Sequence, residues 1–113
     1  MLKPLKVVFG VVLLLLLVGP TFAESVDTAW VRTYNGPGNG EDYAVAIVKD
    51  GSGDVYVTGY SKGSGTDYDY ATIKYYPNGD TAWVRRYNET GNGSDGANAM
   101  VIDVYGNAYV TGY

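Results

Sequence analysis

The stretch "DTAWVRTYNG" (residues 27–36) decides the fold, because it returns 53 residues later as "DTAWVRRYNE" (residues 80–89). The two copies hold the only two tryptophans of the 113-residue chain. Aligned without a gap, residues 27–60 and 80–113 are identical at 22 of 34 positions. A fixed period in, or just above, the range of about 20–50 residues is typical of solenoids, propellers and arrays. We therefore expect one structural unit to occur more than once.

One period contains four segments that have the composition of β-strands, since β-branched and aromatic residues dominate them. These segments are residues 43–49, 54–60, 69–76 and 81–87. The first of them is apolar almost throughout, which is typical of a strand buried on both faces. Strict alternation along this strand would place Ala44, Ala46 and Val48 on one face.

Glycines predict how these strands are connected. "DGSGD" (50–54) and "DVYGN" (103–107) carry Gly one residue before the next strand, where a positive φ closes a short hairpin. "YPNGD" (76–80) has the same signature, whereas "NETGNGSDGA" (88–97) is longer and has no tight-turn signal. We therefore expect an all-β fold in which four antiparallel strands form one meander, as in the blade of a propeller.

These motifs resemble the SBBP-type β-propeller repeat of bacterial and archaeal proteins. The resemblance rests on the hairpin halves "GDVYVTGY" and "GNAYVTGY", on the "DTAWVR" strand and on the period near 50, and it covers residues 27–113. It implies antiparallel four-stranded blades in a secreted or surface-attached protein. Family members are mostly uncharacterised, so the resemblance implies almost nothing about activity.

On this interpretation residues 24–113 form an incomplete propeller of roughly 1.7 repeats. They comprise a lone outer strand (27–34), a full blade (43–87) and a partial blade (97–113). A ring needs roughly 4–8 blades. We therefore expect the remaining blades to come from a longer chain, of which this one is a fragment, or from self-association.

The first 23 residues predict a secretory signal peptide whose apolar part is helical. Lys3 and Lys6 precede an apolar run from Val7 to Val18, and small residues lead to a cleavage site after Ala23. A helix of that run rises only about 18 Å, short of the roughly 30 Å hydrocarbon core. We therefore expect a secreted, extracellular or cell-surface protein that meets the membrane only during export. A periplasmic location and an uncleaved anchor are the alternatives.

The charge balance and the missing residue types exclude several functions. Twelve acidic residues face eight basic ones, and the net charge of −4 disfavours nucleic acid as a partner. The chain has no cysteine and no histidine, so it lacks disulfides as well as the commonest general base and metal ligand. No pairing of nucleophile and base is visible. We therefore predict no catalytic residue, no enzyme activity and no resident cofactor.

Two kinds of residue remain as candidate sites. Trp30 and Trp83 either pack between neighbouring units or form a platform for stacking a sugar, and recurrence in each unit favours packing. Asp42 and Asp95 precede corresponding strands. They either accept hydrogen bonds from the backbone of the preceding loop or form a ring of carboxylates that holds Ca²⁺. Capping is the favoured interpretation.

Three functions fit these observations. The preferred one is a binding or structural scaffold that presents loops and blade edges to other blades, to a protein or to a glycan. A carbohydrate-binding, lectin-like module is the first alternative. The second alternative is a hydrolase or lyase propeller that acts through carboxylates, which would need two converging acidic groups.

Overall fold

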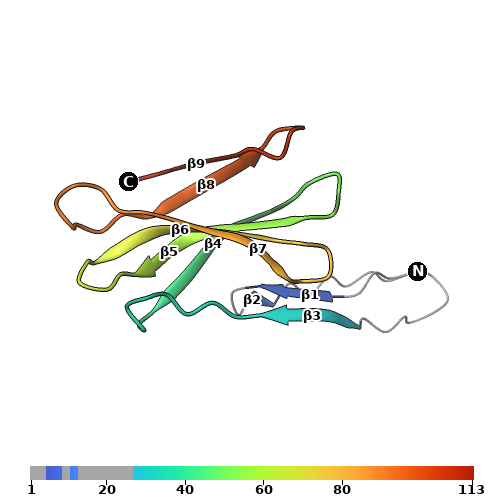
Figure 1. Ribbon diagram of the computed structural model, residues 1–113, viewed down its shortest axis with the longest axis horizontal. Helices are drawn as coiled ribbons and strands as arrows, with labels where there is room; N and C mark the ends of the chain where they lie inside the picture. Colours follow the sequence, from blue (N-terminus) through green and yellow to red (C-terminus); the bar gives the residue numbers. More distant parts are fainter. Residues whose placement is uncertain (1–4, 9–10, 13–26) are drawn as a thin grey trace, which may run out of the picture.

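The computed structural model describes residues 5–8, 11–12 and 27–113, and all regular elements in these ranges are strands (Figure 1). The strands are β1 (Leu5–Val8), β2 (Val11–Val12), β3 (Thr28–Arg32), β4 (Asp42–Lys49), β5 (Val55–Lys62), β6 (Tyr68–Tyr75), β7 (Thr81–Tyr87), β8 (Ala97–Ile102) and β9 (Ala108–Gly112). The all-β prediction is confirmed. These ranges hold no helix that could cross a membrane. Most of the predicted signal peptide, with its cleavage site at Ala23, lies outside the described residues, and its described parts are β1 and β2.

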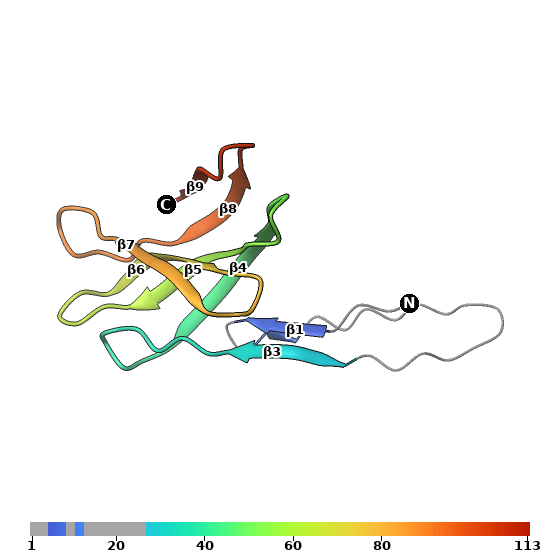
Figure 2. The same cartoon turned by 45° about the vertical axis from the view of Figure 1, so that its right-hand side comes forward.

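The predicted meander is confirmed by the central sheet, whose strand order is β4-β5-β6-β7 with every neighbouring pair antiparallel. Strands β8 and β9 form a separate antiparallel hairpin. Strand β3 pairs in parallel with β1, which pairs in turn with β2. Figures 1 and 2 show the central sheet between β3 on one side and the β8–β9 hairpin on the other.

The predicted turns depend on glycines with positive φ. Gly53 closes the β4–β5 hairpin at φ 86°, and Gly106 closes the β8–β9 hairpin at φ 82°. Gly79, at φ 90°, lies in the turn between β6 and β7 and allows the ring of Trp30 to approach its backbone. Because this conformation strains residues that have a Cβ, these turns fix where each strand reverses.

The core lies on the side of the central sheet that faces β3, which we call the β3 face. Trp30 from β3 packs there against Val55 and Val57 of β5 and Ile73 and Tyr75 of β6, and all five side chains are buried. The indole N–H of Trp30 also donates a hydrogen bond of 3.0 Å to the carbonyl oxygen of Pro77. The Trp30 side chain therefore packs β3 onto the central sheet.

The opposite side, which we call the β8 face, is covered in part by the β8–β9 hairpin. The hydroxyl of Tyr56 on this face shares its one proton between Asp50 (3.1 Å) and the carbonyl oxygen of Gly106 in the β8–β9 turn (3.3 Å). Beside it the hydroxyls of Thr58 and Thr72 are buried and 2.8 Å apart. Both faces of the central sheet are thus in contact with another part of the chain.

Two expectations about β4 were wrong. The strand is half-buried in alternation and not buried on both faces, and Ile47 is 55% exposed. A register shift between Ala44 and Ala46 pairs Ala44 with Gly59 but Ala46 with Thr58, so these two alanines point to opposite faces. The reason is a β-bulge, which inserts one residue and breaks the period of two.

We predict that Gly59→Ala destabilises the fold by about 1–3 kcal/mol. A Cβ at Gly59 would overlap the carbonyl oxygen of Tyr43 beside the bulge, and backbone cannot move aside as a side chain can. Urea denaturation of the two proteins measures the difference. Gly51→Ala is the matched control, because a Cβ there meets no atom within 4 Å. Equal stability of both variants would show that the close approach at Gly59 is absent.

Candidate functional site

Corresponding contacts recur at positions 53 residues apart. The N–H of Gly36 donates to Asp42 (3.1 Å), and the N–H of Glu89 donates to Asp95 (2.9 Å). The bulge of β4 between Ala44 and Ala46 has its counterpart in β8 between Ala97 and Ala99. The loop before β4 and the loop before β8 are therefore built in the same way.

Burial differs between corresponding residues according to what lies next to them. Met100 in β8 is 8% exposed, because β8 packs beside the central sheet, whereas its counterpart Ile47 in β4 is 55% exposed. Tyr56 in β5 is fully buried under the β8–β9 hairpin, whereas its counterpart Tyr109 in β9 is 57% exposed. Side chains at corresponding positions are thus buried in the copy that another pair of strands covers and exposed in the copy that none covers.

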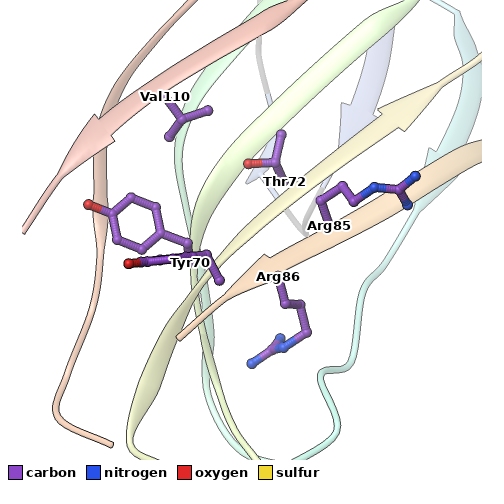
Figure 3. A pocket seen from close by; sticks show the side chains of 6 residues that line it. Tyr70, Thr72, Arg85, Arg86 and Val110 are labelled. Atoms are coloured by element: carbon purple, nitrogen blue, oxygen red, sulfur yellow. The ribbon is translucent and has the colours of Figure 1, made fainter. Parts of the chain in front are cut away.

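The β8 face carries a groove at the outer strands of the central sheet. It has a volume of about 300 Å³ and is lined by Tyr70, Thr72, Arg85, Arg86, Tyr87 and Val110 (Figure 3). Its lining comes from β6, β7 and β9, and Val110 faces the other residues from the far wall. The groove therefore lies where the β8–β9 hairpin leaves the outer part of this face uncovered.

The two candidate tryptophans lie in different surroundings. Trp30 is 8% exposed in the core, with its ring 5.7 Å from that of Tyr75, a position that supports the packing interpretation. Trp83 is half-buried on the β8 face, edge-on to Tyr56 at 6.0 Å, with the guanidinium of Arg85 over its ring at 5.7 Å.

The two candidate aspartates accept backbone hydrogen bonds, which supports capping of the loops. Asp95 is buried, and its own N–H donates to the carbonyl oxygen of Tyr68 at 2.6 Å. Within the described ranges no three acidic side chains gather closely enough to hold a metal ion. The structure therefore adds no support for a calcium ring through Asp42 and Asp95.

Sequence reasoning missed an aromatic and charged group at the end of the sheet where β4 begins. We call it the tyrosine cluster, and its members are Glu41, Tyr43, Tyr60, Lys62 and Tyr68. The rings of Tyr43 and Tyr60 stack with centroids 4.9 Å apart. One carboxylate oxygen of Glu41 accepts hydrogen bonds from Tyr43 (2.8 Å) and Tyr68 (2.9 Å). No sequence motif marks this group, because its members come from three separate segments.

The hydrogen bonds within the tyrosine cluster shift the pKa values of both phenols and of the carboxylate. The hydrogen bond that Tyr43 donates to Glu41 raises the pKa of Tyr43 to about 12, and the hydrogen bond that Tyr68 donates to Glu41 raises the pKa of Tyr68. In return the two hydroxyls lower the pKa of Glu41. The carboxylate is therefore charged and both phenols are neutral throughout the physiological range.

Arg86 is a second residue that the sequence did not single out, because its counterpart in the first copy is Thr33. Its guanidinium reaches the β3 face and donates to the hydroxyls of Ser61 (2.7 Å) and Tyr34 (3.0 Å) and to the carboxylate of Asp69 (3.0 Å). Asp69 is 5% exposed. The buried ion pair joins β7 to β6, and the hydrogen bond to Tyr34 joins β7 to the segment that follows β3.

Comparisons with protein-family models, with curated proteins and with solved structures found no match to this chain.

We predict that Arg86→Met lowers the free energy of unfolding by about 3–5 kcal/mol, because the carboxylate of Asp69 would remain buried without its cation. Its sequence neighbour provides the control. Arg85 is exposed on the other side of β7, so Arg85→Met should change stability by less than about 0.5 kcal/mol. Chemical denaturation of both variants decides the matter, and equal losses would contradict the buried ion pair.

We predict that Glu41→Gln moves the pKa of Tyr43 from about 12 back toward 10.0. The raised pKa of Tyr43 contributes stability to the fold below pH 10, and this contribution is lost as the pH rises through about 12. The lowered pKa of Glu41 contributes stability that is lost when the pH falls into the acid range. The ring ¹³Cζ chemical shift of Tyr43 reports its titration. Glu89→Gln serves as the control and should leave Tyr43 unchanged. A Tyr43 pKa that does not respond to Glu41→Gln would rule out the hydrogen bond.

Proposed function

We propose that this chain is a secreted or cell-surface scaffold module of the β-propeller type, whose units stack face to face and present their loops for binding. One observation carries the proposal. The central antiparallel meander is covered on one face by β3, a copy of its own last strand, and on the other by β8–β9, a copy of its own first two strands. The resemblance to the SBBP-type repeat, the apolar leader sequence and the acidic charge all agree with it.

The burial pattern supports stacking in one direction. The contacts of Trp30 with Tyr75 and Pro77 join the last strand of one unit to the next unit along the chain. The corresponding indole, Trp83, points to the β8 face, where β9 offers Val110 as the counterpart of Val57. In this proposal the groove beside Trp83 accepts the third and fourth strands of the unit that begins with β8.

An appended hairpin tests the proposal. A second copy of Ser61–Tyr87, joined directly after Tyr113 and carrying Phe in place of its own tryptophan, should pair with β9 and cover Trp83. We predict that acrylamide quenching of Trp83 falls to the level of Trp30 and that self-association through the open edge of β9 decreases. A scrambled segment of the same length is the control. If Trp83 remains as accessible with the true copy as with the scrambled one, units do not stack in this way.

A carbohydrate-binding role is the second candidate function. The tyrosine cluster favours it, because the exposed ring of Tyr43 beside the Glu41 carboxylate is suited to the apolar faces and hydroxyls of sugars. The hydrolase alternative has no comparable observation in its favour among the described residues. We therefore rank sugar binding above catalysis.

A further inference from the structure

Tyr43 carries the exposed aromatic ring of the tyrosine cluster, and two contacts hold this ring in place. One face stacks on Tyr60 at an interplanar angle of 30°, and the hydroxyl is fixed by Glu41 at 2.8 Å. The side chain is still 41% exposed. A ring that is already immobilised loses little conformational entropy when a ligand stacks on it.

This exposure does not arise from a missing neighbour of β4. The β8–β9 hairpin already lies against the β8 face of the central sheet, and the N–H of Asp95 bonds to Tyr68 within the tyrosine cluster. The cluster nevertheless leaves the outer side of Tyr43 open. Tyr43 thus differs from Tyr87, which lines the groove on the uncovered part of the β8 face, and from Tyr109, which is exposed on β9.

The cluster also fails to recur, unlike the positions that hold the units together. Ser94 stands where the first copy has Glu41, and Gly96 stands where it has Tyr43. Stacking of units requires the same side chains in each unit, whereas a ligand site requires its side chains only once. Glu41 and Tyr43 occur in one copy only, as expected for the side chains of a ligand site.

The geometry excludes a cage for an organic cation. The three ring centroids lie 4.9, 5.4 and 6.1 Å apart, so the rings touch one another and leave no space between them. The face of Tyr68 is already covered by the ammonium of Lys62, 5.1 Å from the ring centroid. A ligand must therefore approach from outside and stack on Tyr43.

Polar groups surround this ring on the same loops. Glu41 uses one carboxylate oxygen for both phenols, and its second oxygen accepts no hydrogen bond from the described residues. Lys62 and Asp67 form an ion pair of 2.7 Å, and Ser94 donates to Asp67 at 2.8 Å. The carboxylates of Glu41 and Asp67 outnumber the ammonium of Lys62. This balance favours a neutral ligand whose hydroxyls donate hydrogen bonds to the carboxylates.

We propose that the tyrosine cluster is a binding site for a neutral saccharide, whose apolar ring face stacks on Tyr43 and whose hydroxyls bond to Glu41 and the Lys62–Asp67 pair. This site is distinct from the groove that Arg85 and Val110 line.

Titration of the full chain with cellohexaose, mannohexaose and xylohexaose, followed by saturation-transfer NMR and calorimetry, tests the proposal. At least one of these neutral hexasaccharides should bind, and Tyr43→Gly, which copies the residue found at Gly96, should weaken that binding at least about tenfold. Tyr43→Phe retains the ring and should bind within about threefold of the wild type. Tyr105→Gly, at an 88% exposed turn residue, should bind as the wild type does.

Three results would overturn the proposal. One is the absence of binding by all three hexasaccharides at a concentration on the order of 10 mM. Another is an equal loss of affinity in Tyr43→Gly and Tyr105→Gly. The third is tighter binding of hexagalacturonate than of any neutral hexasaccharide, because acidic sugars should be repelled by Glu41 and Asp67.

Discussion

The packing of the Trp30 indole on the central sheet is the interaction on which the rest of the structure depends. It buries one large aromatic side chain among Val55, Val57, Ile73 and Tyr75 and satisfies its N–H at the carbonyl of Pro77. Removing a buried side chain of this size typically costs about 3–5 kcal/mol, a large share of the stability of a small domain. Without this contact β3 would be held to the sheet mainly by polar contacts, such as the Arg32–Asp80 ion pair and the bond of Arg86 to Tyr34.

The two faces of the central sheet serve different purposes. The β3 face is apolar under Trp30 and closed by the Arg86–Asp69 ion pair toward the end where β4 begins. The β8 face combines buried threonines, which are covered by β8–β9, with an outer groove and an aromatic end that stay exposed. The loop caps at Asp42 and Asp95 recur 53 residues apart, whereas Arg86, Glu41 and Tyr43 have different residues at the corresponding positions and supply the individual features: the ion pair and the tyrosine cluster.

Much of the fold could be predicted from the sequence, because local signals decide it. Gly53, Gly79 and Gly106 mark reversals that need positive φ, and alternation in β7 places Trp83 and Arg85 on one face. The bulge in β4 could not be predicted, since its apolar residues suit either register. The tyrosine cluster and the Arg86 network are assembled from segments far apart in the chain, and only the pairing of the strands brings them together. A search for repeated positions also leads away from them, because Glu41, Tyr43 and Arg86 are changed in the other copy.

Hydrogen exchange at the two indole N–H groups tests the central claim most directly. Both tryptophans occupy the same position in "DTAWVR", yet only Trp30 is buried with its N–H bonded to a backbone carbonyl. The account predicts that the Trp30 indole proton exchanges only when the sheet opens, with protection close to that of the amides in β5 and β6, whereas the Trp83 proton exchanges at least about a hundredfold faster. Equal and rapid exchange of both indoles would show that β3 does not pack on the sheet and would contradict the account.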